Sequence, residues 1–228
     1  MSEVKVTTGG MDYVDKAGEL LFQTFGTNPP MNFVLGGMSA EKKRQFSPEY
    51  FRILMRAAAL NNAIIEEADD WSALCVLVPP DSHVENPATL VQAGFLSLLW
   101  NIGAKGCWRL FVDFVPVCDA AKERAINNHE KHFYIMFGAT DRNKRRKGLM
   151  QYLLKRCQET ARREGLPIWA ECSTIAARDL VASQGFKLTE EIIVGKGKAD
   201  VNGNLVAGGE GLKLWGMLWR PEGHSSEY

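Results

Sequence analysis

The sequence of 228 residues predicts an α/β fold, in which strands and helices alternate along one chain. Two observations support this prediction. Apolar residues recur with a helical period of about 3.6 in several stretches, and short apolar runs bounded by turn residues lie between them. In the C-terminal half, a strand, a glycine-containing loop, a helix and a second strand follow one another, which is typical of a sheet flanked by helices.

The N-terminal third is predicted to be helical. A helix is expected over 11–25, because its apolar residues share one face, and Gly26 ends it. A short apolar turn is expected over 31–35. A second helix is expected from Pro48 to about Leu60, because proline suits the first helical position.

The middle of the chain predicts a β-hairpin followed by helices. The hairpin signal is two apolar runs that flank a short polar turn. The predicted elements are strands over 63–68 and 72–78, a helix over 89–102, and a polar helix that Asp119 caps and that reaches about Asn128. The apolar stretch 108–117 stays unassigned.

The C-terminal half gives clearer signals, with glycines at the helix ends and aromatic residues in the strands. The predicted elements are a strand over 132–139, a basic loop over 141–148, a helix from 149 to Gly165, a strand over 167–172, a helix over 174–183, and a closing strand pair at 191–195 and 212–219.

Composition and charge exclude several classes of protein. The 27 basic residues balance the 27 acidic ones, so the chain lacks the overall basic excess of a nucleic-acid-binding protein. The five cysteines form no Cys-x-x-Cys pair, which favours buried reduced thiols over disulfides or a metal site. No apolar run approaches the ~20 residues of a membrane span, and no secretory signal is visible. We therefore expect a soluble cytoplasmic protein.

The loop after the strand at 132–139 is the most informative feature. Backbone N–H groups and the helix dipole make a strand–loop–helix junction a binding site for phosphate, and Gly148 would let the backbone approach a ligand closely. The loop has neither the GxGxxG pattern of dinucleotide sites nor the GxxxxGK(S/T) pattern of P-loops. The candidate ligand-binding residues here are Arg145, Arg146, Lys147, Gly148, Leu149 and Met150.

This loop and the segments after it resemble the GCN5-related N-acetyltransferase (GNAT) superfamily. Arg145 and Gly148 match the family's acetyl-CoA motif Gln/Arg-x-x-Gly-x-Gly/Ala, whereas Met150 departs from its last position. The strand at 165–173 and the helix that ends in Gln184-Gly185-Phe186 are similar to the elements that follow in the family. The layout is most similar to puromycin N-acetyltransferase-like small-molecule acetyltransferases of fungi.

The resemblance covers about residues 131–221 and implies the GNAT fold for a single domain of residues 1–228. This fold has a mixed central β-sheet flanked by helices, with its strands 4 and 5 splayed around acetyl-CoA. In the family, backbone N–H groups of strand 4 polarise the thioester carbonyl. By position these belong to Phe137, Gly138, Ala139 and Thr140. Gly138 is expected to mark the bulge that splays the strands.

The catalytic residues are harder to transfer from the family. Its general acid is a tyrosine four residues before the Gly of the Gly-Phe pair, where this chain has Val181, and Ala177 replaces a frequent asparagine. Glu171 and His132 are the candidates for the general base. Glu66 and Glu67 are further candidates; for each carboxylate, the alternative is a solvated or salt-bridged surface role.

The acceptor is expected to be a small, fairly apolar amine, such as a metabolite, a toxin or an antibiotic-like compound. Helical segments within 1–60 and 86–118 are expected on the acceptor side, although their apolar residues are also consistent with ordinary helix cores. Because side chains alternate along a strand, Trp169 and Glu171 are expected to share a face and to form one side of a pocket.

The sequence therefore predicts an acetyl-CoA-dependent N-acetyltransferase, active as a monomer or homodimer, with no nucleic-acid or membrane partner. One alternative is a GNAT-fold protein that binds acyl-CoA or another ligand with little or no turnover, which Val181, Ala177 and Met150 favour. A remote alternative is a nucleic-acid-binding protein that uses the basic run 142–147.

Overall fold

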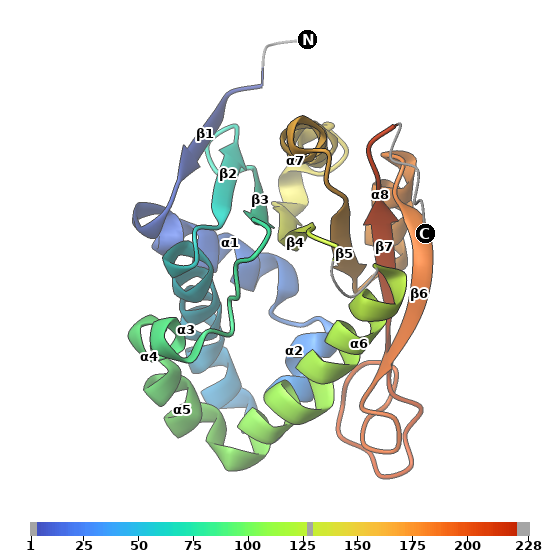
Figure 1. Ribbon diagram of the computed structural model, residues 1–228. Coiled ribbons are helices and arrows are strands. Elements are labelled where there is room, and N and C mark those ends of the chain that lie inside the picture. Colours follow the sequence, from blue (N-terminus) through green and yellow to red (C-terminus); the bar gives the residue numbers. More distant parts are fainter. Residues whose placement is uncertain (1–3, 127–129, 223–228) are drawn as a thin grey trace.

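A seven-stranded sheet organises the computed structural model, which describes residues 4–126 and 130–222 (Figure 1). From left to right in Figure 1 the strand order is β1-β2-β3-β4-β5-β7-β6. Only β4 and β5 pair in parallel, so the predicted mixed sheet is confirmed. The strands are β1 (Val6–Gly9), β2 (Ile64–Ala68), β3 (Ala73–Val78), β4 (Phe133–Thr140), β5 (Ile168–Cys172), β6 (Lys187–Val194) and β7 (Leu212–Trp219).

Helices cover both faces of this sheet. Buried apolar side chains of α1, α2, α3, α5 and α6 pack on one face, and those of α7 and α8 pack on the other. Among the described residues, no helix combines the length and apolar character needed to cross a membrane. The α-helices are α1 (Val14–Phe25), α2 (Pro29–Val34), α3 (Ala40–Leu60), α4 (Pro87–Ala93), α5 (Phe95–Trp108), α6 (Val115–Ala125), α7 (Leu149–Glu164) and α8 (Ile175–Ser183).

The N-terminal third differs from the prediction at two points. The strand β1 was not expected; it adds to the edge of the predicted hairpin by pairing with β2. The helix expected to begin at Pro48 begins at Ala40 instead, and Pro48 lies inside it. The physical reason is a cap: the Ser39 side chain accepts a hydrogen bond from the Lys42 N–H at 3.2 Å.

The segment between β3 and β4 also differs from the prediction. The single helix expected over 89–102 is split into α4 and α5 at Gly94, whose φ of 110° lies in the left-handed region. The unassigned stretch 108–117 holds the end of α5, a π-helical turn (Arg109–Phe114) and the start of α6. Asp119 is not a helix cap, because α6 already begins at Val115. The expected end of this helix at Asn128 lies outside the described residues.

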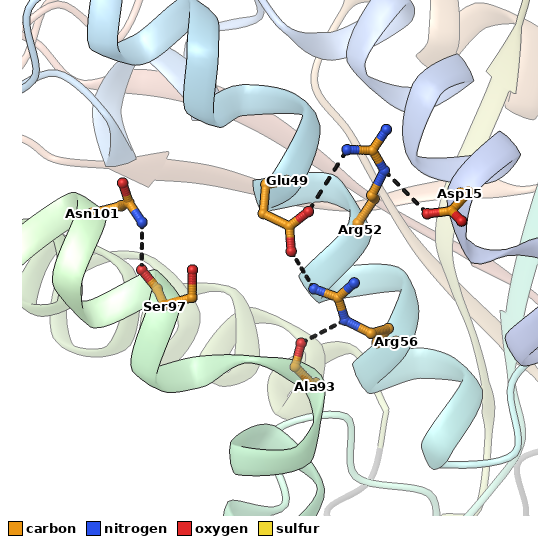
Figure 2. Close-up of polar contacts among 7 residues, drawn as sticks. All are labelled: Asp15, Glu49, Arg52, Arg56, Ala93, Ser97 and Asn101. Carbon is orange, nitrogen blue, oxygen red and sulfur yellow. Dashed lines mark hydrogen bonds and ion pairs between the residues drawn. The ribbon is translucent and has the colours of Figure 1, made fainter.

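Arginines of α3 hold the neighbouring helices in place (Figure 2). Arg52 lies 3.3 Å from Asp15 of α1 and 3.7 Å from Glu49. Arg56 pairs with Glu49, and its Nε donates to the carbonyl oxygen of Ala93, the last residue of α4, at 2.8 Å. The last carbonyl oxygens of a helix have no N–H donor within that helix. By donating to one of them, Arg56 caps α4 and links it to α3.

All five cysteines are free, as predicted. Four of them are buried and Cys107 is half-buried. The Sγ atoms of Cys75 on β3 and Cys157 on α7 lie 3.5 Å apart where this helix packs on the sheet.

Gly216 on β7 gives a stability prediction, because it lies against the fully buried Trp169. A Cβ atom at 216 would lie 2.3 Å from this indole, whereas a Cβ atom at Gly138 would meet only the flexible end of Met150 at 3.3 Å. We expect Gly216→Ala to lower the free energy of unfolding by about 2–3 kcal/mol and Gly138→Ala by less than about 1 kcal/mol. Urea unfolding of both variants measures this, and equal losses would contradict the packing described.

Candidate active site

The strands β4 and β5 pair over a short segment and then separate. Phe133, Tyr134 and Ile135 pair with residues 168–170, and the remainder of β4 pairs with β3. The C-terminal half of β4 therefore presents an open edge toward β5. This separation is the splay predicted from the sequence.

A β-bulge lies where the strands begin to separate, but it is not at Gly138. Val76 of β3 pairs with Phe137 and Leu77 pairs with Ile135, so Met136 is the extra residue. Gly138 pairs regularly with Cys75, and the prediction that it marks the bulge is wrong. Its missing side chain instead leaves room for the Met150 side chain of α7.

Two of the four predicted backbone amides face the opening. The Asp141 N–H donates to the carbonyl oxygen of Ser72, at the β3 side, at 3.0 Å. Because backbone polar groups point to alternate sides along a strand, the N–H groups of Gly138 and Thr140 point to the open edge. Those of the alternate residues Phe137 and Ala139 point to β3.

The loop after β4 ends at an uncapped helix N-terminus. Gly148, with a φ of 80°, is the residue just before α7, and no side chain caps this end. The first N–H groups of a helix have no intrahelical acceptor, so those of Leu149 and Met150 are available to a ligand. The side chains of 145–147 are exposed around them.

These residues fit a pyrophosphate. An anion at this point meets free N–H groups, the positive end of the helix dipole and three basic side chains. Met150 departs from the family motif, but its side chain is buried against Gly138. The departure is therefore accommodated within the sheet.

Glu171 lies at the point where β4 and β5 separate. It directly follows Ala170, the last residue of β5 that pairs with β4. The Trp169 Nε1–H donates to its Oε1 at 2.5 Å, so these two side chains share a face as predicted. The Tyr134 hydroxyl also hydrogen-bonds this carboxylate. Burial raises the pKa of Glu171, although both hydrogen bonds and the charge of Lys122 lower it.

Sequence reasoning missed the part of this site that α6 supplies. The Lys122 ammonium lies 5.8 Å from the centre of the Tyr134 ring and bonds Asp119 Oδ1 at 2.8 Å. Burial lowers the pKa of Lys122, but the bond and the charges of Asp119 and Glu171 outweigh this, so the pKa is raised. Burial also raises the pKa of Cys118. Alternation along β4 could have revealed Tyr134, whereas no sequence signal places α6 over it.

The other candidate bases lie elsewhere. His132 directly precedes the segment of β4 that pairs with β5, so it lies at the end where the two strands are still joined. Burial lowers the pKa of His132, and its Nδ1 lies 3.1 Å from the Glu130 carbonyl oxygen. Glu66 forms a two-pronged ion pair with Arg156 of α7. Glu67 accepts hydrogen bonds from the Thr7 hydroxyl and the Trp71 N–H, at 2.6 Å each. Both carboxylates therefore have structural roles.

In the described part of the chain, no group of three or more His, Cys, Asp and Glu side chains gathers as metal ligands would.

Comparison with known proteins shows a likeness to one family. Residues 95–186 match the model of the acetyltransferase (GNAT) family. This segment is similar to a GNAT acetyltransferase domain. A fission yeast (Schizosaccharomyces pombe) protein described as an uncharacterized N-acetyltransferase is 20% identical over 178 residues, which cover 78% of this chain and 72% of the yeast protein.

Solved structures share the GNAT fold over almost the whole chain. A Corynebacterium glutamicum protein described as histone acetyltransferase HPA2 and related acetyltransferase superposes with a TM-score of 0.64 at 14% identity, covering 98% of each chain. Arylalkylamine N-acetyltransferase 2 of Aedes aegypti superposes with a TM-score of 0.59 at 18% identity, covering 96% of this chain and 99% of the mosquito chain. At these identities the likeness concerns the fold.

Proposed function

We propose that this protein transfers an acetyl group from acetyl-CoA to the amine of a small, largely apolar acceptor. The observation that carries the proposal is the position of Glu171. A partly buried carboxylate stands where β4 and β5 separate, next to an open strand edge that leads to the uncapped N-terminus of α7.

The donor is held by backbone groups in this proposal. The first N–H groups of α7 bind the pyrophosphate, assisted by Arg145, Arg146 and Lys147. The polar groups of Gly138 and Thr140 on the open edge of β4 bind the pantetheine arm, as a neighbouring strand would. One of these N–H groups donates to the thioester carbonyl oxygen as negative charge develops on it.

Glu171 is proposed as the general base. An amine is mostly protonated at neutral pH, since alkylammonium groups titrate near ~10.4. The Glu171 carboxylate takes one proton from the acceptor ammonium, and the nitrogen lone pair then forms a bond to the acetyl carbon while the carbon–sulfur bond breaks. The nitrogen loses its second proton to water as the amide forms. Because burial raises the pKa of Glu171, it is a stronger base than an exposed carboxylate.

The leaving thiolate is proposed to take its proton from water. Val181 is buried at the position where the family has its tyrosine, so α8 offers no acid there. A thiol titrates near ~8.5, so its thiolate leaves without an acid more readily than an alkoxide would. The lack of an acid also favours the second candidate function, a GNAT-fold protein that binds acyl-CoA and transfers it very slowly.

Aromatic side chains support an apolar acceptor body. Phe137 of β4 packs against Phe25 of α1 and Phe51 of α3, with ring centres 5.9 Å and 6.2 Å away. These rings lie on the face of the sheet opposite α7 and α8. We propose that the helices within 1–60 and 86–118 enclose the acceptor on this face.

Transfer is tested by supplying acetyl-CoA together with a panel of small amines, and by following free thiol and the mass of the product. Arylalkylamines, aliphatic monoamines, diamines and amino acids form the panel. We expect thiol release that depends on an amine and an acceptor that gains one acetyl group. Acetyl-CoA binding without product from any amine would support the binding-protein alternative.

A further inference from the structure

An open cleft lies beside the loop that follows β4. It has a volume of about 590 Å³, within the range of small-molecule sites. The end of α1, the first turns of α3 and the loop residues 141–143 line it. Phe22 contributes an apolar side chain to the wall, and Gly26 and Thr27 extend the lining to the turn that leads to α2.

Three basic side chains line this cleft: Lys43 and Arg44 from α3 and Arg142 from the loop. Within the described residues, none of the three forms a salt bridge. The acid in the lining, Asp141, already accepts the Asn143 N–H at 2.7 Å. The cleft therefore has a local excess of positive charge in a chain with no net charge.

Lys43 is the most informative of the three. It is half-buried, and its Nζ donates to the Asn32 side chain of α2, which holds the ammonium in place. Burial lowers its pKa, because a charge partly removed from water without an opposite charge is costly. The first turn of α3 begins at Ala40, also in the lining, and adds the positive end of a 21-residue helix. An anion bound here would offset all of these charges.

The cleft opens on the acceptor face of the sheet. Its walls come from α1 and α3, which pack on the face opposite α7 and α8, whereas the donor site begins at the N-terminus of α7. The turn at its end leads to Asn28, whose Nδ2 lies 3.3 Å from Ser173 Oγ, just beyond β5. The cleft thus lies against the loop residues that directly follow β4, on the side of α1 and α3.

We propose that this cleft binds an anionic group of the acceptor, a carboxylate or a phosphate, so that the substrate is a small amine that also carries an acid. This inference rests on the proposed acetyl transfer and narrows its substrate class. It also makes polyamines poor acceptors, since Lys43, Arg44 and Arg142 repel a second ammonium.

A binding experiment tests the cleft independently of any transfer. Phenyl phosphate is titrated into the protein with CoA present in excess, so that the donor loop is filled. We expect Lys43→Glu/Arg44→Glu to weaken phenyl phosphate binding at least tenfold. The control is Lys155→Glu/Arg163→Glu, which makes the same change in net charge on exposed positions of α7 and is expected to bind as the wild type does. Equal binding by all three proteins would overturn the cleft assignment.

Kinetic measurements decide whether the anion that the cleft binds belongs to the acceptor or to acetyl-CoA. Phenylalanine is expected to be acetylated with a kcat/KM at least tenfold above that of phenylalanine methyl ester, and Lys43→Glu/Arg44→Glu should remove this preference. A preference for the ester would overturn the inference but leave acetyl transfer standing. Weaker binding of acetyl-CoA, but not of 3′-dephospho-acetyl-CoA, by this variant would also overturn it, because the cleft would then hold a donor phosphate. If neither phenylalanine nor its ester is acetylated, the proposed function fails for aromatic amino acids and their esters. The phenyl phosphate titration alone then decides whether the cleft binds an anion.

Discussion

Glu171→Gln is expected to lower kcat at least 100-fold while leaving the affinity for acetyl-CoA within about threefold of the wild type. Glutamine keeps the size of the side chain and an oxygen that accepts the Trp169 N–H, but it cannot take a proton from the amine. Steady-state kinetics and a calorimetric titration measure the two quantities. The matched control is Glu191→Gln on the edge strand β6, an exposed carboxylate paired with Lys213, which should retain full activity.

The pH dependence of the wild-type rate follows from the same residue. The pKa of Glu171 is raised above the ordinary glutamate value of 4.5, and its deprotonated form is the base. The rate should therefore fall as the pH decreases through a value above 4.5, and this acidic limb should be absent from the residual activity of Glu171→Gln. An unchanged limb in the variant would assign the base to another group.

Stability separates loss of chemistry from loss of structure in this variant. A carboxyl group whose pKa is raised by folding stabilises the folded state below its unfolded pKa, and this contribution is lost as the pH rises through the folded pKa. At pH 8 the wild type thus keeps a costly buried charge that glutamine lacks. Glu171→Gln should melt at or above the wild-type temperature at pH 8, and this advantage should shrink in acid.

Gly148→Asp is expected to weaken acetyl-CoA binding at least 100-fold. The new carboxylate would stand at the positive end of α7, where it would accept the free N–H groups and repel the pyrophosphate. Little destabilisation is expected, because a Cβ atom at 148 meets only the Gln151 side chain, at 3.7 Å, and aspartate tolerates the left-handed backbone better than most residues do. Calorimetric titration with acetyl-CoA measures the loss.

Gly165→Asp is the control for this variant. Gly165 ends the same helix, has a similar left-handed φ of 68° and also has open space around it. The same substitution there introduces the same charge and the same backbone strain, but at the far end of a 16-residue helix, about 24 Å away. Wild-type affinity is expected for Gly165→Asp. Equal losses at both glycines would mean that strain, and not a phosphate site, explains the effect.

Local signals predicted most of the C-terminal half of the fold well, although β6 begins at Lys187, four residues before the start expected for the strand at 191–195. The strand at 132–139, the helix that ends at Gly165 and the strand at 167–172 lie within one or two residues of β4, α7 and β5. Their boundaries are set by glycines and apolar runs that a sequence displays. The wrongly predicted start of α3 shows the limit of such signals. Pro48 suggests a helix start, but it lies inside α3, where the burial of apolar side chains before and after it outweighs the low helix propensity of proline.

The candidate site could be named from the sequence where a family resemblance and backbone position define it. Gly148 and the amides of β4 were assigned in this way, whereas the bulge at Met136 depends on pairing with β3, which the sequence does not show. Glu171 could be named as one carboxylate among several, but only the fold distinguishes it from Glu66, which Arg156 neutralises. Lys122 and the basic cleft depend on how α6 and α3 pack, so no local pattern could predict them.

A crystal structure of the protein with acetyl-CoA tests the central claim most directly. We predict that the pyrophosphate oxygens lie within about 2.7–3.2 Å of the first N–H groups of α7. The pantetheine arm should follow the open edge of β4 at Gly138 and Thr140, and the thioester should lie beside Glu171 where the strands separate. A donor bound elsewhere, with the gap between β4 and β5 empty, would contradict the proposed site.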